Sequence, residues 1–97
     1  MRMMMEVSMP VEAGNKALKD GSQARAMQST SERLKPEAAY FLTSEGERTA
    51  LFFFNMDDTS QIPPIVEPLF ASLHAAVTLS PAMNADDLQK GLAAASS

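Results

Sequence analysis

Four short apolar stretches in the sequence, at positions 3–9, 38–43, 48–55 and 76–80, predict β-strands. The first is ended by Pro10, and the third carries Leu-Phe-Phe-Phe at its centre, a composition typical of strands. The segment Ser-Glu-Gly-Glu at 44–47 separates the second stretch from the third. It predicts a tight hairpin turn, because Gly46 can supply the positive φ that a two-residue loop requires.

Two longer segments follow a helical period. Between positions 11 and 34 small and apolar residues recur every three or four positions, and the glycines weaken this helix enough that we expect a break before Ser22. From 62 to 75 the pattern is again helical, but Pro68 has no N–H to donate to the carbonyl of Pro64. We therefore expect a kink or two short pieces there. A last helix, from 85 to about 94, is predicted to be capped by Asn84.

The resulting order of elements is β-α-β-β-α-β followed by a C-terminal helix. This order is that of the ferredoxin-like fold, in which a split βαβ unit forms a four-stranded antiparallel sheet with two helices on one face. We therefore predict an α+β protein whose strands lie in the order 4-1-3-2. A chain of 97 residues has room for one such domain, spanning 1–97.

Both faces of the predicted sheet carry apolar residues. Along the third strand Leu51 and Phe53 point one way, while Phe52 and Phe54 point the other. In the first strand every second residue from Met3 to Met9 is apolar, whereas the alternate set includes Glu6 and Ser8. We assign the wholly apolar set of the first strand to the helix side. The open side is then expected to carry Met4, Glu6, Ser8, Ala50, Phe52 and Phe54.

An open face with two or three phenylalanines predicts an interface. Burying each of these side chains fully is worth roughly 1.5–3 kcal/mol, and exposed apolar patches of this kind mark sites of association. We expect a homodimer in which two copies pack face to face under two-fold symmetry. The alternative is that the C-terminal helix folds over the open face of its own chain.

Composition narrows the possible partners and cofactors. The net charge is −4, and the eight lysines and arginines are scattered along the chain, so neither nucleic acid nor an anionic membrane surface is an expected partner. No apolar run reaches the length of a spanning helix, and a cytoplasmic location is expected. The absence of cysteine and the single histidine exclude thiolate and multi-histidine metal sites within one chain. We predict no metal and no cofactor.

Three segments carry a resemblance to a known superfamily: Lys-Pro-Glu-Ala-Ala-Tyr-Phe at 35–41, Glu-Pro-Leu-Phe at 67–70 and Val-Thr-Leu-Ser-Pro-Ala-Met-Asn at 77–84. The chain resembles the small bacterial proteins of the dimeric α+β barrel superfamily, and in particular an uncharacterised group among them. The resemblance implies the fold and the pairing of two sheets, but no reaction. Its wider members include cofactor-independent monooxygenases, muconolactone isomerases, stress-induced proteins and haem proteins similar to chlorite dismutase. The haem proteins need an axial histidine in the cavity, whereas His74 is expected at a helix end.

Glu6 is the first candidate for chemistry, because it is a lone carboxylate in a methionine-rich strand that we expect to line the dimer cavity. In such a place it would suit a general base. The alternative is a carboxylate that pairs with Arg48 or with a cation of the second subunit.

Arg48 and Tyr40 are the other candidate catalytic residues. With a Glu45-Gly46 loop, Arg48 lies across from Thr43 and shares a face with Ala50 and Phe52, where it would hold a substrate carboxylate or form an edge salt bridge. The same register places Tyr40 on the helix side as an amphipathic core residue. A three-residue loop would turn it toward the cavity.

The remaining ionisable residues have structural explanations beside the functional ones. His74 and Glu67 would form a proton relay, or His74 would simply occupy a helix C-terminus. The acidic pairs at 57–58 and 86–87 would hold a cation, or they would cap helices; neither matches an EF-hand loop.

Three functions are therefore compatible with the sequence. The leading hypothesis is a homodimer that binds a small apolar or aromatic ligand in a cavity at the sheet face. The second is a cofactor-independent oxygenase or isomerase on the same scaffold, with Glu6 as its base. The third is a structural or regulatory interaction module, which would be favoured if side chains fill the cavity.

Overall fold

A computed structural model describes residues 1–96, and it confirms the predicted α+β, ferredoxin-like fold. The predicted elements are all present, with bounds that differ by one or two residues from the expected ones. In chain order they are β1 (Arg2–Met9), α1 (Val11–Asp20), α2 (Ser22–Leu34), β2 (Ala38–Ser44), β3 (Glu47–Asn55), the 3₁₀ helix η1 (Thr59–Gln61), α3 (Ile62–Leu73), β4 (Ala76–Pro81) and α4 (Ala85–Ala95). None of the helices within 1–96 has the length and apolarity needed to cross a bilayer.

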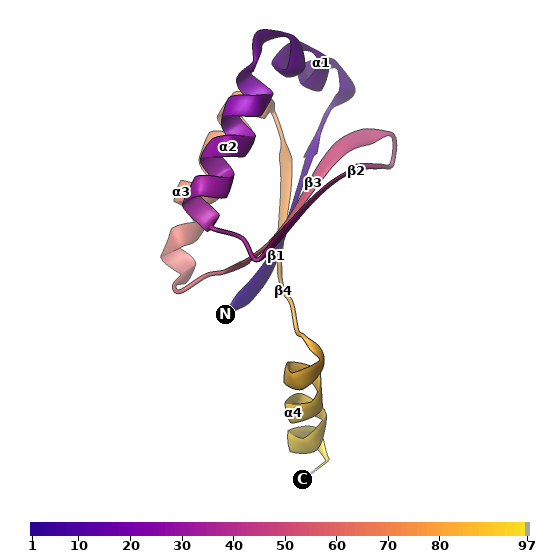
Figure 1. Cartoon of the computed structure of the whole chain (residues 1–97), viewed down its shortest axis with the longest axis vertical. Coiled ribbons are helices and arrows are strands. Elements are labelled where there is room, and N and C mark those ends of the chain that lie inside the picture. The colour runs from indigo at the N-terminus through magenta and orange to yellow at the C-terminus, as the bar shows by residue number, and fades with distance from the viewer. Residues whose placement is uncertain (97) are drawn as a thin grey trace.

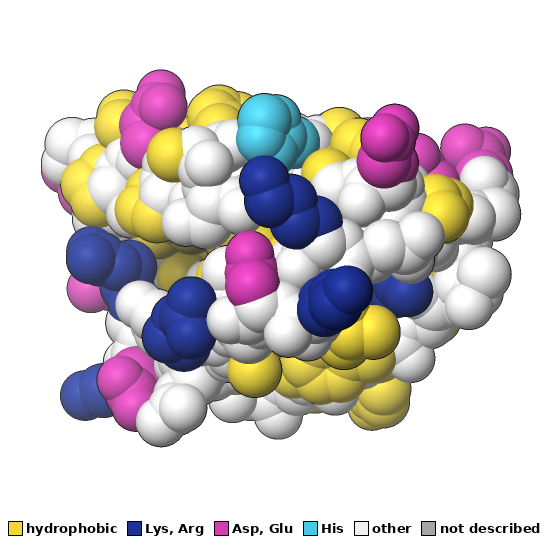
Figure 2. All heavy atoms as spheres, turned by 90° about the horizontal axis from the view of Figure 1, so that it is seen from above, with side chains coloured by type: hydrophobic (Ala, Val, Ile, Leu, Met, Phe, Trp, Pro, Cys, Tyr) yellow, Lys and Arg dark blue, Asp and Glu magenta, His cyan; other side chains and the backbone are white. Residues whose placement is uncertain are grey.

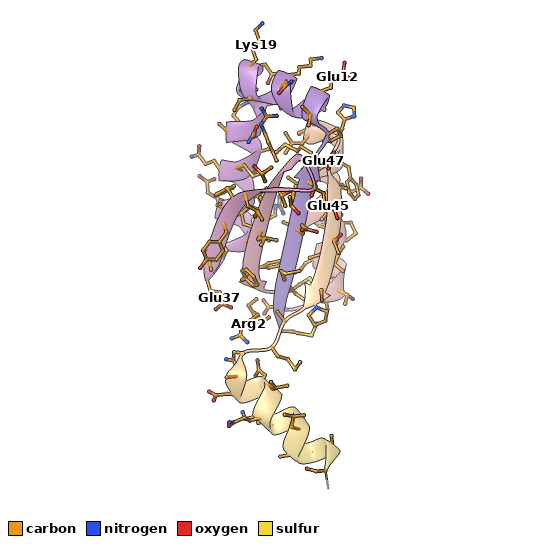
Figure 3. The ribbon with its side chains drawn as sticks, turned by 90° about the vertical axis from the view of Figure 1, so that its right-hand side faces the viewer. Arg2, Glu12, Lys19, Glu37, Glu45 and Glu47 are labelled. Carbon is orange, nitrogen blue, oxygen red and sulfur yellow. The ribbon has the colours of Figure 1, made fainter. Side chains whose placement is uncertain are left out.

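The four strands form one antiparallel sheet in the order β2-β3-β1-β4, as predicted. Helices α1, α2 and α3 lie on one side of this sheet, while α4 extends beyond its end (Figure 1). No helix within residues 1–96 lies over the opposite side of the sheet (Figures 1 and 3). We call it the open face.

Local sequence signals explain where the elements break and turn. Gly21 adopts a left-handed conformation with φ of 82°, and this residue separates α1 from α2 at the expected break. The β2–β3 hairpin turns through Glu45 and Gly46, both at positive φ, which is the geometry of a two-residue loop. The predicted cap Asn84 accepts a hydrogen bond from the backbone N–H of Asp87 and starts α4.

Of the kink or two short pieces expected in the second helical segment, the two pieces are not observed, because α3 runs from Ile62 to Leu73 through Pro68. Proline at this position removes one backbone hydrogen bond. The helix nevertheless buries Ile65, Val66, Leu69 and Leu73 against the sheet. Burial of four branched apolar side chains outweighs the loss of a single bond.

The face assignment of β1 is confirmed, whereas that of β3 was wrong. Residues directly opposite each other in an antiparallel ladder point to the same side of a sheet. Met3, Met5 and Val7 lie opposite Phe54, Phe52 and Ala50, so these three residues of β3 point toward the helices rather than toward the open face. All six are at most 5% exposed, and together with residues of α3 they form the centre of the core.

Helix α4 does not fold back over the sheet. It continues past the end at which β4 leaves the sheet, and all eleven of its residues are exposed (Figure 3). The alternative in which the C-terminal helix shelters the open face is therefore not the observed arrangement, and that face stays uncovered within the chain.

Candidate functional site

The open face is an array of side chains in three rows that cross all four strands. The pairing of the strands defines these rows, because cross-strand neighbours share a side of the sheet. From β2 to β4, the rows are Ala38, Phe53, Met4 and Ser80; Tyr40, Leu51, Glu6 and Thr78; and Leu42, Thr49, Ser8 and Ala76.

The open face is divided into an apolar half and a polar half. Large apolar side chains gather over β2 and β3, where Tyr40 is 60% exposed, Leu42 is 41% exposed, and Leu51 and Phe53 are half-buried. The rings of Tyr40 and Phe53 meet edge to face, with 6.5 Å between their centres. Over β1 and β4 the face carries mainly carboxylate and hydroxyl groups. The two halves meet at the boundary between β3 and β1.

Glu6 lies at this boundary, in the middle row. Its cross-strand neighbours are Leu51 on one side and Thr78 on the other. No ion pair to Glu6 is formed within residues 1–96, and the expected pairing with Arg48 is not observed there. Its half-buried carboxylate is therefore a charge that no cation of the described chain neutralises.

Tyr40 lies on the open face, and its expected position on the helix side was wrong. The hairpin has the two-residue loop on which that expectation rested, and Tyr40 pairs with Leu51, which in turn pairs with Glu6. The structure thus brings two of the predicted catalytic residues into one row. Their Cα atoms are separated by two strand spacings, or about 10 Å.

Arg48 lies apart from these two residues. As predicted, it faces Thr43 and shares a side of the sheet with Ala50 and Phe52, but that side is the helix side. Its Nη2 donates to Oδ1 of Asn15 at 3.0 Å, and its Nη1 lies where a side chain on Gly14 would be, so that α1 holds the guanidinium in place. Arg48 also lines a hollow of about 280 Å³ beside the hairpin.

The expected cavity residues are thus separated by the sheet. Met4 and Ser8 lie on the open face with Glu6, and Ser8 shares a hydrogen bond of 3.2 Å with Thr49. Ala50, Phe52 and Phe54 are core residues on the other side. The open-face residues missed by the sequence-based prediction include Leu42, Leu51, Phe53 and Thr78. Leu51 and Phe53 lie in the same apolar run as Phe52 and Phe54, but at the alternate positions, which were expected on the helix side.

The other candidates occupy the structural positions that were considered for them. His74 follows α3 at φ of 52° and is exposed, and its backbone N–H caps the helix. Asp58 caps η1, and hydrogen bonds from Ser60 hold the pKa of its carboxyl below the ordinary value. The described part of the chain contains no group of three or more histidine or acidic residues arranged to hold a metal ion.

An ionic bridge fixes the start of α4. Arg2 donates from Nε to Glu37 at 2.8 Å and from Nη1 to Asp87 at 2.7 Å, at the end of the sheet from which α4 departs (Figure 3). The pKa of Asp87 is lowered by a hydrogen bond from the backbone N–H of Asn84 and by the Arg2 guanidinium. The backbone N–H of Ala82 also donates to the carbonyl of Arg2. These contacts hold α4 away from the open face.

Helix α4 exposes an apolar stripe. Leu88 and Leu92 are 46% and 60% exposed, and they lie one helical turn apart. Ala85 and Ala95 extend the stripe by one turn in each direction. The chain therefore presents two uncovered apolar surfaces, namely the open face and the α4 stripe.

At the end of the molecule where α1 lies, several basic side chains lie across the middle of the surface with an acidic side chain among them, and further acidic side chains lie toward its edges (Figure 2). Hydrophobic side chains gather at the lower right of that view. The sequence matches no protein-family model, and no curated protein is significantly similar to it.

Proposed function

We propose that the chain is a homodimer of the dimeric α+β barrel type, in which two open faces stack about a two-fold axis and enclose a site for a small apolar or aromatic ligand. The observation that carries this proposal is the uncovered apolar half of the open face, with Tyr40 and Leu42 more than 40% exposed. A cysteine-free chain of this kind suits the reducing cytoplasm.

The size of the open face explains why α4 takes part in the dimer. Four strands about 4.8 Å apart, each about seven residues long at about 3.3 Å per residue, have roughly 450 Å² of flat area. Stable complexes bury about 800 Å² on each partner. The face alone is too small, and the Leu88–Leu92 stripe of α4 supplies a second apolar surface. A two-fold pair buries both surfaces on both copies.

A second copy of the chain is the partner that best fits the open face and the α4 stripe. Both uncovered surfaces belong to the same chain, and the Arg2 bridge directs α4 outward, where its own sheet is out of reach. Two such copies complete each other without another partner.

Glu6 and Tyr40 define the ligand site in this arrangement. Stacking places the boundary between the apolar and polar halves inside the dimer, with a carboxylate, a phenol and the Thr78 hydroxyl beside an apolar wall. Such a mixture of apolar walls and a few polar groups is typical of small-molecule sites.

The solution mass of designed variants tests the dimer. We expect the wild-type chain to show twice its 10.5 kDa mass in size exclusion with light scattering. The double variant Y40E/L42E should show 10.5 kDa, because it places charges within the apolar half of the stacked faces. The matched control L18E/F70E also adds two carboxylates at exposed apolar positions, but on α1 and α3, and it should remain dimeric. A wild-type chain with the mass of one copy would overturn the proposal.

A second candidate function, acid–base catalysis, is favoured by one observation: Glu6 and Tyr40 lie in one row of the open face, on either side of Leu51. A carboxylate and a phenol can act as base and acid in a proton transfer. On a substrate that the protein converts, E6Q should abolish turnover while the dimer remains intact. Unchanged turnover in E6Q would exclude Glu6 as the base.

A further inference from the structure

We propose that the hollow between α2 and the β2–β3 hairpin is a second ligand site, which takes a small carboxylic acid that also carries an O–H or N–H donor. This site lies on the helix side of the sheet, so it is separate from the ligand site at the open face and does not depend on dimer formation. Three independent features of the hollow support the assignment.

The first feature is the space itself. Strand β2 forms the edge of the sheet and projects beyond the helices, so that Phe41 is 64% exposed although it points to the helix side. The resulting hollow has a volume of about 280 Å³. Ligand pockets usually have volumes of about 300–1,000 Å³, so this one suits a ligand of one ring or a short aliphatic chain.

The second feature is an acceptor without a partner. Gln23, which lines the hollow, has its Oε1 atom shielded from solvent, and no group of residues 1–96 donates to it. A buried polar atom left in this state is costly, and native proteins rarely keep one without a function or a bound partner. If the amide is turned by 180°, an N–H takes the same position and still needs a partner. Because the atom is shielded from solvent, the Gln23 side chain must rotate toward the hollow before a polar group of a ligand can satisfy it.

The third feature is the Arg48 guanidinium, most of whose N–H donors form no hydrogen bond within residues 1–96. Arg48 has five N–H donors, and only the Nη2 bond to Asn15 is made within the described chain. This bond and the close approach to Gly14 restrict the side chain before any ligand binds. A restricted guanidinium is well suited to a carboxylate, which it can bind through two parallel hydrogen bonds.

The rest of the lining is mainly apolar and aromatic, with Thr43 and Thr49 as its polar members. Met9, Met27 and Ala50 form apolar parts of the wall, and Phe41 stands beside them with its ring edge to face against Phe52, at 6.2 Å between centres. A ligand with a hydrocarbon body would bury this surface, with its carboxylate at Arg48 and its donor at Gln23. The lining therefore favours hydroxylated aromatic acids over inorganic anions.

Binding of benzoate, 3-hydroxybenzoate and 4-hydroxybenzoate to the full-length protein tests the site. In two-dimensional NMR titrations we expect saturable shifts of the backbone amides of Gln23, Met27, Phe41 and Arg48. One of the hydroxylated acids should bind about tenfold more tightly than benzoate, because its O–H reaches Gln23. Q23L should abolish this preference, and it should also raise the unfolding midpoint of the free protein, because it removes an unpaired buried acceptor.

Charge variants distinguish specific binding in the hollow from general electrostatic attraction between the acids and the protein. R48Q should weaken all three acids at least tenfold, and R48K, which keeps the charge, should weaken them less. The control R33Q makes the same change of charge on α2, outside the hollow, and should leave binding unchanged. The proposal is overturned if no probe binds saturably, if R33Q matches R48Q, or if Q23L keeps the hydroxyl preference. Shifts confined to Leu51 and Thr78 would also overturn it, while supporting the open-face site.

Discussion

The two faces of the sheet are built from the same strands, yet they differ in what covers them. On the helix side, Met5 and Phe52 are opposite each other and fully buried. One position further along each strand, on the open face, Glu6 lies opposite Leu51, and both are only half-buried. On the helix side, the apolar strand residues are covered and are therefore buried. The open face has similar residues in β2 and β3, but within this chain nothing covers them.

Along β1, the two faces of the sheet differ in amino-acid composition. Its helix-side residues are all apolar, whereas its open-face residues include Glu6 and Ser8. Strand β3 is apolar on both faces over positions 51–54. The polar groups of the open face are therefore concentrated on one half, and the apolar half is left for association.

The largest expected effect comes from truncating matched phenylalanines on the two faces. F52A removes a fully buried ring and should lower the free energy of unfolding by about 3–5 kcal/mol. F53A removes a half-buried ring of the open face, and its cost to the folding of a single chain should be markedly smaller. Urea denaturation at low protein concentration measures both values. Equal losses would mean that the two faces are equally buried in the single chain.

The same pair of residues shows how far the sequence alone can predict the fold. The element order, the strand order, the hairpin turn and the Asn84 cap follow from local signals, and all of them are observed. The side to which Phe52 and Phe53 point does not follow, because both are phenylalanine and a shift of one residue exchanges the faces. Only the pairing of Met5 with Phe52 settles this point.

The candidate site was accordingly predicted in part. Glu6, Met4 and Ser8 are on the open face as expected, because β1 has one wholly apolar set that belongs in a core. Tyr40 and Arg48 each lie on the side opposite to the one expected for them: Tyr40 is on the open face and Arg48 is on the helix side. Once the faces of β3 are exchanged, its own residue Arg48 changes sides, and so do the β2 residues paired with β3. The hollow at Gln23 depends on how far β2 projects beyond the helices, and no local pattern carries that information.

The second-largest effect should follow from removing the apolar stripe of α4. L88S/L92S exposes no core residue, so the unfolding of the single chain should change little. If the stripe packs on a second copy, losing two leucines should weaken the dimer by about 3 kcal/mol or more, which is over a hundredfold in the dissociation constant. Analytical ultracentrifugation measures the constant.

The control for this variant is Q89S/K90S, which replaces two exposed polar residues of the same helix. It lowers helix propensity to a similar degree without touching the leucines. An equal weakening of the dimer in both variants would attribute the effect to helix stability and would remove α4 from the proposed interface.

The smallest effect is expected at the start of α4, where the contacts that keep this helix off the open face depend on pH. The folded pKa of Asp87 lies below its ordinary value of 3.8, so its contribution to stability is present above that value and is lost as the pH falls through the folded pKa. Amide NMR shifts of α4 should therefore move as the pH falls below 3.8, while core amides move only at global unfolding. D87N should remove the α4 transition, because it has no carboxyl to titrate. D86N, one residue earlier in the same turn, should retain it, and a transition that survives D87N would show that another group controls the start of α4.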